Sequence, residues 1–117
     1  MIRILIVEDE TALRLLYSEE LTREGYEVVA VPDAERANEA LQRERFNLII
    51  TDIRMPGRDG VELITEVMGV RKDIPIIINT AYESYKQDFM TWAADAYIVK
   101  SSSLDELKAK IKEILGR

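Results

Sequence analysis

The sequence contains neither cysteine nor histidine among its 117 residues. Without cysteine there can be no disulfide framework, so an intracellular location is expected. Without histidine there can be no Ser-His-Asp triad, no histidine-ligated zinc and no phosphohistidine within this chain. Any chemistry at a functional site is therefore expected to depend on carboxylates.

Long hydrophobic runs and an excess of positive charge are also absent. The longest apolar runs, such as IPIII from Ile74, are far too short to cross a bilayer, and no signal peptide is recognisable, so we expect a cytoplasmic protein without membrane insertion. The net charge of −6 argues against direct nucleic-acid binding, because such binding relies on Lys and Arg. The length and the 47% hydrophobic content predict one globular domain over residues 1–117.

Short apolar runs alternate five times with longer segments of helical period. The predicted strands are Ile2–Val7, Glu27–Val31, Asn47–Thr51, Ile74–Asn79 and Ala96–Val99. The predicted helices are Thr11–Glu24, Ala34–Glu44, Gly60–Val70, Ser84–Ala94 and Leu104–Leu115. Because several strands are almost continuously apolar, they suit a parallel sheet covered on both faces. The pattern predicts an α/β fold, a doubly wound (βα)5 unit.

Turn and capping residues support these boundaries. Gly25 is expected to end the first helix, and Pro32 and Asp33 precede the second. Ser103 and Glu106 have the S-x-x-E spacing of a capping box for the last helix.

Acidic residues follow two of the apolar strands. Glu8 and Asp9 follow the first strand, Asp52 follows the third, and Lys100 follows the fifth. The carboxyl ends of parallel strands meet at one edge, so we expect a single charged crevice. Any one acid there could simply cap the next helix, but three together repel unless cations neutralise them. Lys100 supplies one positive charge and Mg2+ would supply the rest, leaving metal positions for a phosphoryl group.

Four segments resemble the receiver domain of two-component response regulators. They are ILIVEDE at residues 4–10, LIITDIRMPGRDGVEL at 48–63, IIINTA at 76–81 and AYIVKSSSLDELK at 96–108. The segments occur in the family's order and spacing and cover essentially the whole chain. The resemblance implies a flavodoxin-like sheet with strand order 2-1-3-4-5.

The resemblance also implies a phosphoacceptor. Asp52 matches the aspartate that takes a phosphoryl group from the phosphohistidine of a histidine kinase or a histidine phosphotransfer protein. Glu8, Asp9, Asp52 and the backbone carbonyl of Arg54 match the ligands of Mg2+, with Mn2+ as an alternative. Such a protein is not an enzyme in the usual sense, because it catalyses only its own phosphorylation and dephosphorylation.

Further family positions match residues near this site. Lys100 matches the lysine that pairs with the acceptor and then with the phosphoryl oxygens, Thr80 the hydroxyl that moves toward them, and Tyr97 the aromatic switch residue. Judged without the family, Thr80 could simply satisfy a backbone group and Tyr97 could be core. Arg54 and Tyr82 match positions that tune how easily water reaches the acyl phosphate.

Ser101 departs from the family pattern, which usually has a proline joined by a cis bond after the lysine. A cis bond before a non-proline residue costs about 2.5–4 kcal/mol, against about 0.5–1 kcal/mol before proline. We expect either a strained cis bond between Lys100 and Ser101 or a trans bond with a remodelled loop.

Aromatic side chains gather in one segment: Tyr82, Tyr85, Phe89, Trp92 and Tyr97. In the family, the fourth helix, fifth strand and fifth helix form the usual output face, so we expect a downstream protein to bind there. Packing of Phe89 and Trp92 in the core is the plainer alternative.

The sequence thus predicts a phosphorylation-dependent switch in which Asp52 accepts a phosphoryl group and the chain controls a partner or relays the group onward. The alternative from another class is a pseudo-receiver, an interaction module that works without phosphorylation. A phosphatase with an aspartyl-phosphate intermediate would need a second acid two residues after the nucleophile, where this chain has Arg54.

Overall fold

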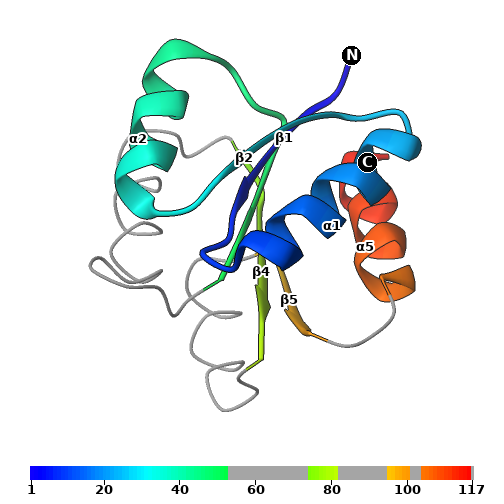
Figure 1. Cartoon of the computed structure of the whole chain (residues 1–117). Helices are drawn as coiled ribbons and strands as arrows, with labels where there is room; N and C mark the ends of the chain where they lie inside the picture. Colours follow the sequence, from blue (N-terminus) through cyan, green and yellow to red (C-terminus); the bar gives the residue numbers. More distant parts are fainter. Residues whose placement is uncertain (53–73, 82–94, 101–103, 117) are drawn as a thin grey trace.

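Five parallel strands form one sheet with helices on both faces in the computed structural model, which describes residues 1–52, 74–81, 95–100 and 104–116 (Figure 1). The strands are β1 Arg3–Val7, β2 Glu27–Val31, β3 Leu48–Thr51, β4 Ile76–Thr80 and β5 Ala96–Val99. The described helices are α1 Thr11–Arg23, α2 Ala34–Arg43 and α5 Asp105–Leu115. The order β2-β1-β3-β4-β5, with every pairing parallel, confirms the predicted fold and topology.

Strand boundaries agree with the prediction except at a few ends. β2 and β5 have the predicted bounds, whereas β4 begins two residues later than predicted, at Ile76. Pro75 explains this shift, because proline has no N–H to donate to a neighbouring strand. The predicted helices over residues 60–70 and 84–94 lie outside the described residues.

Helix ends follow local capping chemistry. After α1, Gly25 adopts a positive φ of 96°, and its N–H and that of Tyr26 donate to the carbonyls of Thr22 and Leu21, as in a Schellman motif. Asp33 caps α2 by accepting from the backbone N–H of Arg36 at 2.9 Å. α5 begins at Asp105, with Leu104 in the cap position and no side-chain cap, while Ser103 of the predicted capping box lies outside the described residues.

Two apolar layers cover the sheet, and strand alternation assigns each side chain to one of them. One layer packs the sheet against α2 through residues such as Ala37 and Leu41. The other packs it against α1 and α5, where Leu21 and Ile111 are fully buried (Figure 1). Ile77 of β4 belongs to this second layer, whereas its neighbours in the strand belong to the first. Among the described helices, none has the length and apolar character needed to span a membrane.

Candidate functional site

The predicted acidic crevice forms on the α1 and α5 side of the sheet, at the carboxyl ends of the strands. Glu8, Asp52 and Lys100 each stand two residues after an isoleucine that packs in this layer. Those isoleucines are Ile6, Ile50 and Ile98. Because side chains alternate along a strand, the three charged side chains continue the same face into the crevice. The strand pattern itself therefore brings them together.

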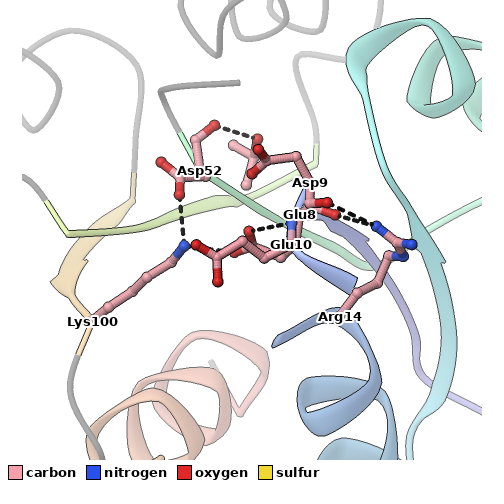
Figure 2. Close-up of polar contacts among 7 residues, drawn as sticks. Glu8, Asp9, Glu10, Arg14, Asp52 and Lys100 are labelled. Carbon is pink, nitrogen blue, oxygen red and sulfur yellow. Dashed lines mark hydrogen bonds and ion pairs between the residues drawn. The ribbon is translucent and has the colours of Figure 1, made fainter. Parts of the chain in front are cut away.

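Lys100 bridges two carboxylates (Figure 2). Its Nζ lies 2.6 Å from Glu8 Oε1 and 2.7 Å from Asp52 Oδ2. The side chains of Lys100, Glu8 and Asp52 are only 15%, 3% and 7% exposed. Charged hydrogen bonds in a water-poor site are stronger than at the surface, so the ammonium holds both acids in place.

Burial and neighbouring charges shift the pKa values of Lys100 and Glu8. Burial disfavours the charged form of Lys100, but its hydrogen bonds to Asp52 and Glu8 outweigh that effect and raise the pKa of the ammonium above its usual value. Burial raises the pKa of Glu8, while the hydrogen bonds from Lys100 and the Glu10 N–H lower it in part. Lys100 is therefore protonated at neutral pH.

Asp9 completes a group of three acids. Ligand oxygens of Glu8, Asp9 and Asp52 all lie within 4.8 Å of one another, and Asp9 is half-buried. Three carboxylates and one ammonium leave two excess negative charges when all are ionised. Hard divalent cations such as Mg2+ prefer carboxylate oxygens and bind through one or two of them. The donor set and its charge therefore fit a Mg2+ site.

Arg14 secures the loop that carries the acidic pair, which sequence reasoning did not anticipate. From the first turn of α1, its guanidinium donates to the backbone carbonyl of Glu8 at 2.8 Å and to that of Asp9 at 3.4 Å (Figure 2). An arginine four residues into a helix is common on any exposed face, so nothing in the sequence pattern marked it.

Thr80 lies on β4, between the strands that lead to Asp52 and Lys100, and Tyr97 lies on β5, three residues before Lys100. Thr80 is fully buried at the end of β4, and its backbone carbonyl accepts from the Lys100 N–H at 2.7 Å. Tyr97 is buried among the residues that pack toward α2. Their roles as switch residues stay predictions. Arg54, Tyr82, the Lys100–Ser101 bond and the aromatic residues Tyr85, Phe89 and Trp92 lie outside the described residues.

The chain is similar to known proteins in its sequence. Residues 4–112 match the family model of the response regulator receiver domain. The transcriptional regulatory protein RprY of Bacteroides fragilis is 37% identical to this chain, and the matched region covers 99% of this chain and 50% of RprY. The two-component response regulator PhoP of Pseudomonas aeruginosa is 36% identical over 98% of this chain and 52% of PhoP. The chain thus spans about half the length of these curated relatives.

Solved structures match over nearly the full length. The response regulator TrrA of Thermotoga maritima, in complex with Mg2+–BeF, is 45% identical with a TM-score of 0.92, covering 97% of this chain and 99% of TrrA. TrrA in its complex with the histidine kinase ThkA superposes with a TM-score of 0.90, at 45% identity over 98% of this chain and 99% of TrrA. From its sequence, its sheet order and these relatives, the chain belongs to the response regulator receiver domains of two-component systems.

Proposed function

We propose that this chain is a single receiver domain over residues 1–117 that accepts a phosphoryl group on Asp52 and changes its surface in response. One observation carries the proposal: the buried Asp52 carboxylate is held by Lys100 within a cluster of acids suited to Mg2+. Phosphoryl transfer needs positioning and charge neutralisation more than covalent help, and this cluster offers both. The complex of TrrA with a histidine kinase supports a phosphohistidine donor.

In the proposed reaction, a carboxylate oxygen of Asp52 forms a bond to phosphorus while the P–N bond to the donor histidine breaks. The electron pair of the P–N bond stays on the imidazole, which leaves as a neutral ring if its other nitrogen already carries a proton and otherwise takes a proton from solvent. Lys100, protonated because its pKa is raised, stays beside the acceptor and stabilises negative charge on the phosphoryl oxygens. Asp52 thereby becomes an acyl phosphate.

Glu8, Asp9, Asp52 and the backbone carbonyl of Arg54 are the proposed holders of Mg2+, or of Mn2+ in its place. The metal, when bound, neutralises charge on the phosphoryl oxygens. Glu8 already pairs with Lys100, so Asp9 is the proposed direct ligand and Glu8 acts through water. The complex of TrrA with Mg2+–BeF supports a Mg2+ site in this chain.

The signal leaves the proposed site through Thr80 and Tyr97. Thr80 lies on the strand between those of Asp52 and Lys100. A phosphoryl group on Asp52 would add negative charge there, so the Thr80 hydroxyl is expected to move toward the phosphoryl oxygens. Tyr97 lies on the adjacent β5, which the expected output face shares with α5. A downstream protein that binds this face is the proposed reader of the phosphorylated state.

Incubation with a small phosphodonor and Mg2+ tests the proposal directly. We expect a stoichiometric adduct that is stable in acid and labile in base, as an acyl phosphate is, detected by intact-mass measurement. An absent adduct would favour the pseudo-receiver, and sustained multiple turnover would favour a phosphatase. Chelation of the metal should stop adduct formation.

Replacing Arg14 by alanine is expected to weaken Mg2+ binding roughly tenfold, at the lower end of the range for the loss of groups that orient metal ligands. The removed hydrogen bonds hold the backbone of Glu8 and Asp9. The loss of a positive charge beside the metal site would by itself strengthen Mg2+ binding. Calorimetric titration of Mg2+ therefore separates the two effects, with Arg23→Ala, an exposed site on the same helix, as the control. Tighter or unchanged binding would contradict the orienting role.

Arg54 and Tyr82 are proposed to shield the acyl phosphate from water. Replacing both by small residues is expected to speed hydrolysis of the adduct, because attacking water gains access. The decay of the isolated phosphoprotein, followed by mass after removal of the donor, provides the measurement. An unchanged decay rate would refute the shielding role.

A further inference from the structure

Thr51 places a buried hydroxyl next to the acceptor, on the face of the sheet opposite the crevice. It is the last residue of β3 and is 1% exposed. Ile49, two residues earlier, packs in the layer that faces α2, as do Val7 and Ile78, the strand partners of Thr51. Alternation along the strand therefore directs the Thr51 side chain toward α2. Burying a hydroxyl in such an apolar layer costs free energy unless the hydroxyl forms a hydrogen bond.

The partner of this hydroxyl is the backbone of the acceptor itself. The Thr51 hydroxyl donates to the backbone carbonyl of Asp52 at 2.9 Å. The Asp52 N–H donates to the backbone carbonyl of Val7 at 3.3 Å, and the Asp52 carboxylate accepts from Lys100 Nζ at 2.7 Å. Hydrogen bonds thus hold the N–H, the carbonyl and the side chain of Asp52.

The bond to the carbonyl acts just where the chain leaves the sheet. β3 ends at Thr51, so the Asp52 carbonyl belongs to the first peptide after the strand. Each residue has only two soft backbone dihedrals, and a bond that fixes the carbonyl restrains ψ of Asp52. The backbone from which the carboxylate projects is therefore restrained beyond the last strand position. A valine at position 51 would have the same shape and would bury no hydroxyl, but it could not form this bond.

We propose that Thr51 is a positioning residue for the acceptor: its hydroxyl fixes the Asp52 backbone from the α2 side and so keeps the carboxylate in place beside Lys100. Phosphoryl transfer depends on such placement, because a misplacement of ~1 Å can lower a rate about a hundredfold. Thr51 touches neither the metal nor the phosphoryl group in this proposal. Its effect on phosphoryl transfer rests on the proposed function, whereas its effect on the carboxylate does not.

The Asp52 carboxylate provides a test that is independent of metal and phosphorylation. In 13C-labelled protein without Mg2+, the resonance of the Asp52 carboxyl carbon is assigned by its loss in Asp52→Asn. Thr51→Val, which keeps the shape and removes the hydroxyl, is expected to shift this resonance. Thr51→Ser, which keeps the hydroxyl, should leave it close to its position in the unaltered chain.

Thr51→Ala is the matched partner of Thr51→Ser, because the two variants differ only in the hydroxyl. It should shift the carboxyl resonance as Thr51→Val does, and it replaces that variant if valine prevents folding. If Thr51→Ala and Thr51→Ser give the same resonance position, the hydroxyl does not position the carboxylate and the proposal is overturned.

Phosphorylation with a small phosphodonor and saturating Mg2+ adds a second measurement. Thr51→Val and Thr51→Ala are expected to form the adduct roughly threefold to tenfold more slowly than Thr51→Ser, the range that one net hydrogen bond spans. Equal rates in the three variants would overturn the proposal, since the hydroxyl would then only satisfy its own burial. If the unaltered chain forms no adduct, the proposed function fails, and the carboxyl resonance alone decides whether Thr51 positions Asp52.

Discussion

Asp52→Asn is expected to abolish the phosphoryl adduct completely, because an amide oxygen is far less nucleophilic than a carboxylate. The substitution conserves shape, and Lys100 retains its 2.6 Å contact with Glu8. One negative charge disappears from a group of three acids, so at neutral pH without metal the variant should be at least as stable as the unaltered chain. Intact-mass measurement and urea unfolding report the two effects separately.

Asp33→Asn is the control for this result. Asp33 follows β2 at the same edge of the sheet, and asparagine preserves its cap of α2. This variant should form the adduct normally. A persistent adduct in Asp52→Asn would place the acceptor elsewhere, and the proposed chemistry would then be wrong.

Lys100→Met is expected to lower the free energy of unfolding by about 3 kcal/mol at neutral pH without Mg2+, which is the typical loss when one partner of a buried ion pair is removed. Methionine keeps most of the side-chain length but leaves Glu8 and Asp52 buried without their shared cation. Added Mg2+ should recover part of the loss, since the metal restores positive charge and binds the folded state. Urea unfolding with and without Mg2+ measures both effects.

The loss should depend on pH through Glu8. Its pKa is already raised above 4.5 by burial, and removing Lys100 removes two influences that lower it. An acid whose pKa is higher in the folded state than in the unfolded state binds more protons when folded. Stability therefore falls as the pH rises from about 4.5 through the pKa of the folded state. The deficit of Lys100→Met should therefore be smaller at mildly acidic pH than at neutral pH. In the unaltered chain, the pKa of Lys100 is raised by folding. The stability that Lys100 contributes is therefore complete below pH 10.5 and is lost only as the pH rises through the pKa of Lys100 in the folded state.

Lys108→Met provides the comparison. Lys108 also bridges two elements, but its pair with Glu20 is considerably more exposed and is screened by solvent, so we expect a much smaller loss of stability. Equal losses for the two variants, or a stable Lys100→Met protein at neutral pH, would show that the buried cluster does not depend on its ammonium.

The fold could be predicted because the sequence patterns that indicate strands and helices are local. Apolar runs such as that of β1, the glycine after α1 and the aspartate before α2 act within a few residues of themselves. The same locality explains the misplaced start of β4, where apolar Ile74 extended the predicted strand across Pro75, a residue that cannot donate to its neighbour.

Candidate site residues were also predictable, because a strand end is a position in sequence as well as in space. Glu8, Asp9, Asp52 and Lys100 were identified on that ground, and the fold brings them together. Arg14 was not identified, since its contacts are to backbone carbonyls and carry no residue pattern.

The sequence by itself determined which strands end in acids and lysine, and alternation along each strand determined which face those side chains share. Only the tertiary structure decided that Lys100 spans from Asp52 to Glu8 and that burial raises the pKa of Glu8. These features depend on strand order, register and the seating of α1, which join residues far apart in the chain. Distances between such residues arise when the apolar layers pack, and no local pattern encodes them.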